Sequence, residues 1–361
     1  MIEKGVRLLR IVVGMSGGVD SSVTALLLKQ QGHEVIGVFM NNWEEQDEGG
    51  ACTAVADWAD VRHVAEAIGI PYYSVNFAKQ YKEKVFAHFL SEYRLGRTPN
   101  PDVWCNREIK FGVLLDFARK LGAEKLATGH FAGVALRDGA YHLLRAADEN
   151  KDQTYFLYML TQAQLGYALF PVTDLTKAEI REIARKNGLP VSEKKDSTGV
   201  CFIGERNFKQ FLQTYLPAQP GDMVDESGRV LGRHDGLMYY TLGQRRGLGI
   251  GGGGTGERWF VIRKDLANNR LVVAQGEDAS LYQQGALLCE GTWIAGAPPV
   301  EDAWFDCMVR LRHRQKLQKA RARASGEAIE LQFEARQRAV TPGQAAVIYR
   351  GDEALGGGTV I

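Results

Sequence analysis

The fold of this chain is decided by one stretch, Ile11-Val12-Val13-Gly14-Met15-Ser16-Gly17-Gly18-Val19-Asp20-Ser21-Ser22. An apolar, β-branched run leads into a Gly-Gly turn, and residues 23–29 then have a helical pattern with Ser and Asp at its start. A strand, a glycine turn and a helix N-terminus together present free backbone N–H groups and the positive end of the helix dipole. Glycines 17 and 18 allow close backbone approach, and the serine hydroxyls add donors. We therefore expect this turn to bind phosphate.

The turn departs from two common nucleotide-binding patterns. The turn lacks the lysine of G-x-x-x-x-G-K-[ST], and it does not have the G-x-G-x-x-G pattern either. Its S-G-G-V-D-S resembles the pyrophosphate loop (PP-loop) of the ATP pyrophosphatases, which cleave ATP between the α- and β-phosphates and form an adenylated intermediate. The alternative is a glycine turn without a ligand. The resemblance implies ATP contacts at Gly14, Met15, Ser16, Gly17, Gly18, Val19, Asp20 and Ser21.

Length and composition set the class of protein. With 361 residues we expect two or three domains, and 45% hydrophobic with 24% charged residues is typical of a globular protein with an ample core. A net charge of +1 means that any basic face must be local. We find no signal peptide and no apolar run near the ~18 residues that span a bilayer, so we expect no membrane association. Five cysteines without a C-x-x-C pair favour a reduced, cytoplasmic protein with no structural metal site.

The order of predicted elements changes near residue 205. Up to about residue 200, strands and helices alternate, which predicts an α/β fold with a doubly wound, Rossmann-like parallel sheet. Its ligands would lie at the carboxyl ends of the strands. A hairpin is predicted around Asp138-Gly139. Short alternating strands follow residue 205, and residues 286–361 predict a β-barrel-like module. We therefore divide the chain into domains 1–206, 207–276 and 277–361.

Two cysteines lie in polar loop contexts. In residues 98–107 (TPNPDVWCNR), Asn106 can cap the helix that follows, so Cys105 is expected just before a helix N-terminus, where the thiol pKa falls. Asp102 is close enough in sequence to exchange a proton. A buried structural cysteine explains this placement equally well. Cys201 lies among small and polar residues in KDSTGVCFIG (195–204), and two such cysteines in one chain suggest a pair that works together.

Five motifs in order resemble the tRNA-specific 2-thiouridylase family. They are G-M-S-G-G-V-D-S-S, T-P-N-P-D-x-x-C-N-x-x-I-K-F, K-D-Q-T-Y-F-L, D-S-T-G-V-C-F-I-G and Y-T-L-G-Q-R-R-G-L-G-I, between Gly14 and Ile250. The C-terminal module is less distinctive. This family is of a bacterial or organellar, cytosolic type and installs sulfur at C2 of the wobble uridine of certain tRNAs. The resemblance implies a cytoplasmic enzyme, and we expect a monomer.

The resemblance also implies a reaction. ATP, together with Mg²⁺ that needs no dedicated protein site, would adenylate the C2 oxygen, since that oxygen is a poor leaving group and AMP is a good one. Cys201 would carry a persulfide delivered by a sulfur-donor protein. Cys105 would attack that persulfide and release sulfide, or close a Cys105–Cys201 disulfide that a reductant reopens. Asp102 would be the acid/base.

Substrate contacts follow from the same resemblance. Met40 and Gly129 would border the adenine, unless they are only strand-end residues, and both C-terminal domains would contact tRNA. Residues 309–323 carry seven Lys and Arg and no acid, which predicts phosphate contacts on one strand face, although a solvated face is the alternative. The implied tRNA contacts are Asn100, Pro101, Asp102, His130, Lys151, Asp152, Gln153, Arg312, His313 and Gln344. For His130, Lys151, Asp152, Gln153 and Gln344 the alternative is an ordinary surface residue.

Two other functions compete with this one. A PP-loop ligase or synthetase acting on a small molecule would need neither paired cysteines nor a basic C-terminal module. A non-catalytic RNA-binding protein with a relic nucleotide site would not need Asp20, Asp102, Cys105 and Cys201 together.

Overall fold

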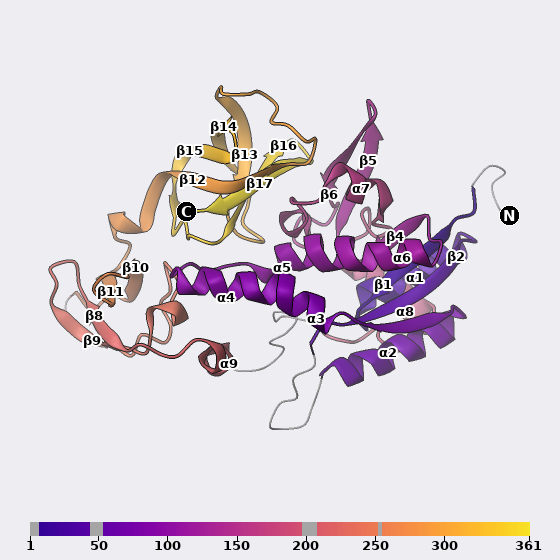
Figure 1. Ribbon diagram of the computed structural model, residues 1–361, viewed down its shortest axis with the longest axis horizontal. Helices are drawn as coiled ribbons and strands as arrows, with labels where there is room; N and C mark the ends of the chain where they lie inside the picture. Colours follow the sequence, from indigo (N-terminus) through magenta and orange to yellow (C-terminus); the bar gives the residue numbers. More distant parts are fainter. Residues whose placement is uncertain (1–6, 44–52, 197–207, 252–254) are drawn as a thin grey trace.

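The computed structural model describes residues 7–43, 53–196, 208–251 and 255–361, so Cys52 and Cys201 lie outside the described residues. Three sheets organise them, one in the α/β part at the right of Figure 1, one in a small central part and one in a barrel at the upper left. The predicted order of a doubly wound parallel sheet, a small central domain and a C-terminal barrel is confirmed. Within the described residues, every helix is too short or too polar to cross a membrane.

The first sheet is parallel and has the order β3-β2-β1-β4-β7. Its strands are β1 (Arg10–Met15), β2 (Glu34–Asn41), β3 (Tyr72–Asn76), β4 (Lys125–Thr128) and β7 (Ala168–Leu169). The associated helices are α1 (Val19–Gln30), α2 (Thr53–Ile68), α3 (Ala78–Tyr81), η1 (Lys82–Phe86), α4 (Ala87–Arg94), α5 (Pro101–Trp104), η2 (Cys105–Leu114), α6 (Leu115–Lys120), η3 (Thr154–Phe156), α7 (Gln162–Tyr167) and α8 (Lys177–Lys186).

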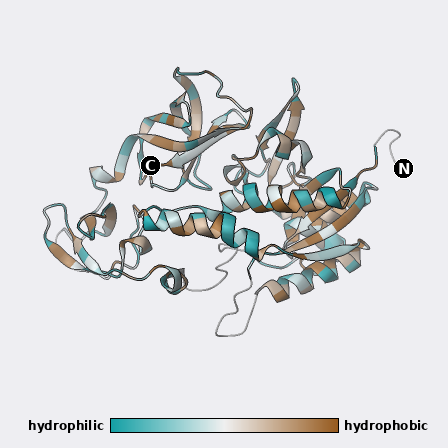
Figure 2. Ribbon diagram, in the orientation of Figure 1, coloured by the Kyte–Doolittle hydropathy of each residue, from teal (hydrophilic) through white to brown (hydrophobic). Residues whose placement is uncertain are grey.

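Strand β1 is buried on both faces, as a central parallel strand requires. Val12 packs in one core cluster with residues of α6, while Ile11 and Val13 pack in another with residues of α1, α2 and α8. The hydropathy colours in Figure 2 show the same layering, with largely hydrophobic strands between helices of mixed colour. Helices therefore cover both faces, and the carboxyl edge of the sheet stays open for a site.

The central part is a four-stranded sheet of order β10-β11-β8-β9. It contains α9 (Phe208–Tyr215), β8 (Gly221–Val224), β9 (Val230–His234), η4 (Leu237–Tyr239), β10 (Trp259–Asp265) and β11 (Arg270–Gln275). The short η5 (Ala279–Leu281) leads into the barrel, whose strands are β12 (Tyr282–Trp293), β13 (Phe305–Arg310), β14 (Gln318–Ser325), β15 (Ala328–Arg338), β16 (Ala345–Arg350) and β17 (Glu353–Val360). Pairing of β12 with β17 closes the barrel.

The predicted hairpin is present as β5 (Ala132–Arg137) and β6 (Ala140–Arg145). Asp138 and Gly139 have φ values of +50° and +80°, as a tight two-residue turn requires. Strand β6 pairs with β17, so this hairpin extends the barrel sheet, although in sequence it lies between the strands β4 and β7 of the parallel sheet. It therefore joins the α/β part to the barrel.

One local prediction is wrong. Cys105 does not precede a helix N-terminus, because the helix already begins at Pro101 and continues through η2 and α6. Asn100 is the N-cap, and its side chain accepts a hydrogen bond from the Asp102 backbone N–H at 3.1 Å. An Asn followed by Pro is a strong start signal that takes precedence over the Asn at position 106. Cys105 consequently lies in the second turn and is 1% exposed.

The K-D-Q-T-Y-F-L motif bridges the α/β part and the barrel. The Asp152 carboxylate lies 2.6 Å from the Arg310 guanidinium, and both side chains are almost fully buried. The Thr154 hydroxyl lies 3.1 Å from the Tyr349 hydroxyl, and the Tyr155 hydroxyl donates to the Ala345 carbonyl at 3.0 Å. These polar contacts fix the orientation of the barrel relative to the phosphate loop.

We predict that Asp152→Ala lowers the free energy of unfolding by about 3–5 kcal/mol, because it leaves Arg310 buried without its carboxylate. Urea unfolding measures this loss, and the double variant Asp152→Leu/Arg310→Met should lose less. The exposed pair of Arg323 and Glu330 provides the control, since Arg323→Ala should cost no more than about 1 kcal/mol. Equal losses for Asp152→Ala and the control would contradict a buried bridge.

Candidate active site

The phosphate loop lies between β1 and α1, as predicted. Gly17 has φ +75°, and a Cβ there would come within 2.7 Å of the Asp57 carbonyl oxygen. Only glycine fits this combination of backbone angle and close contact. Gly18 is the N-cap of α1 and provides no side-chain cap, so the first backbone N–H groups of the helix are available to a ligand. The exposed Ser16 and the buried Ser21 add hydroxyls that lie 3.3 Å apart.

A charge network adjoins this loop. The Lys177 ammonium lies 2.6 Å from the Asp20 carboxylate and 2.7 Å from that of Asp196. Lys151 and Arg181 contact Asp196 at 2.6 and 3.1 Å, so three cations surround two carboxylates. Burial raises the pKa of Asp20 against the opposing effect of Lys177. Burial acts in the same direction on Asp196, but hydrogen bonds from Lys151 and Lys177 lower its pKa to about 2. The surplus positive charge favours an anion beside the loop.

The two strand-end residues predicted to border adenine lie at the same edge of the sheet. Gly129 directly follows β4, and a Cβ there would come within 2.6 Å of the Ser21 backbone nitrogen. The chain therefore passes against the first turn of α1 at a point where no side chain fits. Met40 is half-buried near the end of β2, the strand beside β1. Their contacts with adenine stay a prediction.

The second half of the site is the start of the helix that begins at Pro101. Burial raises the pKa of the Asp102 carboxyl, against the opposing positive charge of Lys110. Cys105 lies one turn further along and is buried. The next residue, Asn106, donates from its side chain to the Phe156 carbonyl at 3.0 Å, which ties this helix to the bridging motif. The Asp102 carboxyl therefore exchanges its proton at a pH closer to neutral than an ordinary aspartate does.

A pairing that the sequence patterns did not reveal connects the two halves. The Lys110 ammonium lies 3.3 Å from Nε2 of His130, and Nδ1 of His130 lies 2.7 Å from the Thr128 hydroxyl. His130 is 8% exposed, so its side chain is part of the interior rather than the surface. Lys110 belongs to the I-K-F end of the second motif. That match to a family motif is the only feature of the sequence that marks Lys110 as a candidate functional residue. Its pairing with His130 needs the fold, because β4 brings position 130 alongside η2.

Several other residues that were predicted to contact tRNA are buried or form hydrogen bonds within the protein, close to the site. Gln153 accepts from the Phe131 backbone N–H at 3.0 Å, and the Gln344 side chain donates to the Thr98 carbonyl at 2.6 Å. Pro101 is buried in the first turn of its helix. The Asp152 side chain is fully buried against Arg310, so it faces the barrel and not solvent. Contacts of these residues with tRNA stay predictions.

The basic stretch 309–323 does not form one cationic strand face. Arg310 is buried, and the three cations of β14 lie within 4.0 Å of carboxylates on the neighbouring strands β13 and β15. Among the described residues no carboxylate lies within 4 Å of the charged groups of Arg312, Arg314 or Lys316, which occupy the β13–β14 loop. Antiparallel neighbours supply acids that a single-strand pattern cannot show. The unpaired positive charge is therefore confined to this loop.

His313 lies in the same loop beside the bridging motif. Its ring centroid is 4.6 Å from that of Phe156, and burial lowers its pKa to about 4. The imidazole is consequently neutral at physiological pH, and contact with a phosphate would be through a neutral donor.

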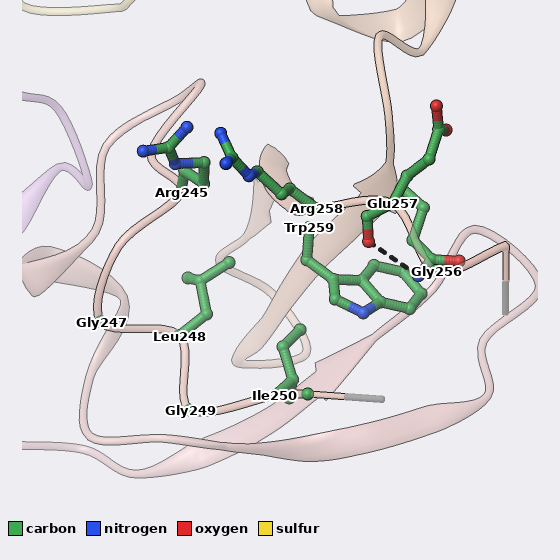
Figure 3. A pocket seen from close by; sticks show the side chains of 11 residues that line it. Arg245, Gly247, Leu248, Gly249, Ile250, Gly256, Glu257, Arg258 and Trp259 are labelled. Carbon is green, nitrogen blue, oxygen red and sulfur yellow. Dashed lines mark hydrogen bonds between the residues drawn. The ribbon is translucent and has the colours of Figure 1, made fainter. Parts of the chain in front are cut away.

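Figure 3 shows a second exposed basic feature, on the central sheet. A cavity of about 390 Å³ is lined by Leu248, Trp259 and two arginines. The exposed side chains of Arg245 and Arg258 lie beside each other at its rim. Arg245 belongs to the Q-R-R part of the fifth motif, which is exposed, whereas Tyr240 and Leu248 of the same motif are buried in the core of the central part.

The parallel sheet and its S-G-G-V-D-S loop define an ATP-using enzyme of the PP-loop type. Family models match almost the whole chain and are described as the tRNA methyl transferase HUP domain (residues 9–205), the tRNA methyl transferase PRC-barrel domain (209–275) and the aminomethyltransferase β-barrel domain (283–360).

Comparison with individual proteins defines the family more narrowly than these domain models do. The chain is 56% identical to the tRNA-specific 2-thiouridylase MnmA of Alkaliphilus oremlandii, over 97% of this chain and 96% of that protein. It is 57% identical to the protein of the same name from Geobacillus thermodenitrificans and 56% identical to that from Bacillus subtilis, in both cases over 97% of this chain and 94% of the other. The chain belongs to the tRNA-specific 2-thiouridylase family.

Proposed function

We propose that the protein transfers sulfur to C2 of the wobble uridine of tRNA in an ATP-dependent reaction, through an adenylated uridine and a cysteine persulfide. The observation that supports this most directly is the meeting of two features at one edge of the sheet. The phosphate loop provides an ATP site, and the helix that begins at Pro101 carries the half-buried Asp102 and the buried Cys105. High identity to 2-thiouridylases over nearly the full length supports the choice of substrate.

The first step activates a poor electrophile. The uridine O2 forms a bond to the α-phosphorus while the bond to the leaving pyrophosphate breaks, and the N3 proton passes to a base. Asp102, with its raised pKa, suits that role. The N–H groups of the loop and the cations Lys151, Lys177 and Arg181 stabilise the departing pyrophosphate. Mg²⁺ would arrive with the phosphates of ATP, as it does in many sites that bind it through one or two carboxylates and substrate phosphates.

The second step exchanges AMP for sulfur. The terminal sulfur of a Cys201 persulfide attacks C2, and AMP leaves with the C2–O electron pair. The Cys105 thiolate then attacks the Cys201 sulfur, which leaves the terminal sulfur on C2 and forms a Cys105–Cys201 disulfide for a thiol reductant to reopen. In the other possible order, Cys105 first releases the sulfur as sulfide, which attacks C2. Cys201 lies outside the described residues, five positions after Asp196 of the charge network.

The proposal also covers the sulfur donor, the oligomeric state, the cellular location and the tRNA-binding surfaces. A protein that carries a persulfide supplies the sulfur, the enzyme acts as a monomer, and it works in the cytoplasm. For tRNA we propose two positive surfaces. The first is the β13–β14 loop with Arg312, Arg314 and Lys316, whose charges have no carboxylate partner among the described residues. The second is the exposed pair of Arg245 and Arg258 on the central sheet (Figure 3).

The products of ATP test the loop assignment. Turnover should yield AMP and pyrophosphate in equal amounts, because the loop holds the β- and γ-phosphates and lacks the Walker lysine. Asp20→Ala should abolish adenylation while the protein stays folded. Chromatography of labelled nucleotides measures both results, and ADP with orthophosphate as primary products would contradict a PP-loop mechanism.

Separate roles of the two cysteines are also testable. Cys105→Ser and Cys201→Ser should both retain uridine adenylation and lose thiolation with a persulfide donor, because serine cannot hold a sulfane sulfur. Cys105→Ser should keep a persulfide on Cys201, which peptide mapping under non-reducing conditions detects. Wild-type protein after one turnover without reductant should contain the Cys105–Cys201 disulfide. Full thiolation by Cys201→Ser would contradict the persulfide step.

The tRNA surface predicts a change in salt dependence. Arg312→Ala/Arg314→Ala should weaken tRNA binding and reduce the slope of log K against log [salt] by roughly one unit for each phosphate that the variant no longer neutralises. The matched control is Lys319→Ala/Arg321→Ala, which removes two cations of β14 that lie within 4.0 Å of Glu334 and Asp306. Equal slopes for the two double variants would place the tRNA elsewhere.

A further inference from the structure

Lys110 is a cation whose contacts in the described structure leave its charge uncompensated. It is half-buried on η2, and its ammonium contacts Nε2 of His130 at 3.3 Å. Because an ammonium group can only donate, Nε2 accepts, and the ring hydrogen is on Nδ1, which donates to the Thr128 hydroxyl. Burial, together with the charge of Lys110, lowers the pKa of His130 well below its ordinary value. The imidazole is therefore neutral.

No acid among the described residues forms an ion pair with Lys110. Glu108, two positions earlier on the same helix, lies 3.2 Å from Lys84 and 3.3 Å from Arg107. The charge of Lys110 does act on the Asp102 carboxyl, but no contact within 4.0 Å joins the two. Lys177, by comparison, lies between two carboxylates. A half-buried ammonium held by a neutral ring is costly unless an anion binds beside it.

The position of Lys110 indicates which anion that is. His130 follows Gly129, whose backbone lies against the first turn of α1 at the phosphate loop. The ring of His130 packs with those of Phe111 and Phe170, whose centroids lie 6.2 and 6.1 Å from its own. Asp102 precedes Lys110 on the same helix. The ammonium thus contacts the residue that follows Gly129 at the phosphate loop, and it is near enough for its charge to act on the Asp102 carboxyl. In the proposed reaction, the group between the pyrophosphate and the uridine is the α-phosphate of ATP.

We propose that Lys110 is a further catalytic residue, which binds a non-bridging oxygen of the α-phosphate, and that His130 is the positioning residue that holds it there. This rests on the proposed function. As uridine O2 bonds to phosphorus and the bond to pyrophosphate breaks, the ammonium stabilises the negative charge on the non-bridging oxygens and keeps its own proton. It remains beside the same phosphate when AMP later leaves C2, so one cation serves both steps.

The direct test is single-turnover adenylation of tRNA with α-labelled ATP. Lys110→Met should slow this step by roughly 10²–10³-fold, the usual effect of removing one such donor. Lys110→Arg, which keeps the charge, should retain most of the rate. The matched control is Lys84→Met, which removes a neighbouring cation that pairs with Glu108 and should adenylate at the wild-type rate. Adenylation by Lys110→Met at the wild-type rate would overturn the inference.

A stereochemical measurement separates contact from a merely structural effect. Wild-type protein should discriminate between the two diastereomers of ATP that carry sulfur on the α-phosphate, since only one directs oxygen at Lys110. Lys110→Met should show a smaller ratio of rates for the two diastereomers. An unchanged ratio would show that Lys110 does not touch the α-phosphate, whatever its effect on the overall rate.

A third measurement uses unmodified protein and does not depend on a variant that folds. ATP with a methylene bridge between its α- and β-phosphates should protect Lys110 from an amine-reactive label and leave Lys84 unaffected, as peptide mass analysis reports. Unchanged labelling of Lys110 at saturating analogue would overturn the inference. If wild-type protein forms no AMP from ATP in the presence of tRNA, the proposed function itself fails, and that result is distinct from failure of the Lys110 variants alone.

Discussion

Gly129 packs against the first turn of α1 so closely that any side chain would come within 2.6 Å of the Ser21 nitrogen. This backbone contact sets the geometry of the site. It places the end of β4 on the phosphate loop, and the next residue, His130, then reaches Lys110 on η2. A larger residue at position 129 would separate the loop from the helix that carries Asp102 and Cys105. The chemistry of two distant motifs therefore depends on one residue without a side chain.

A set of buried polar contacts between the α/β part and the barrel is the second feature on which the arrangement of the structure depends. Asp152 and Arg310 form a buried ion pair, and Tyr155 donates to a barrel carbonyl. Such contacts are directional, so they fix orientation as well as distance. They hold the β13–β14 loop, with Arg312, Arg314 and Lys316, in one position relative to the phosphate loop.

Local patterns predicted much of this correctly. Glycine positions and the periodicity of apolar residues, which are properties of short segments, were enough to predict the phosphate loop, the parallel sheet and the turn at Asp138-Gly139. The failures concern partners distant in sequence. Pairing of β6 with β17, of Arg310 with Asp152 and of Lys110 with His130 needs the three-dimensional arrangement. The start of the helix that carries Asp102 and Cys105 was misplaced for a local reason, since Asn occurs at both 100 and 106 and the adjacent proline favours the earlier cap.

The central claim is that activation by ATP and sulfur transfer occur on one uridine of tRNA. Mass analysis of nucleosides from tRNA incubated with the protein, ATP, Mg²⁺ and a persulfide donor tests it most directly. The account predicts 2-thiouridine at the wobble position, formed only with ATP and accompanied by one AMP for each sulfur incorporated. Formation of AMP on a small-molecule substrate, with the tRNA nucleosides unchanged, would contradict it.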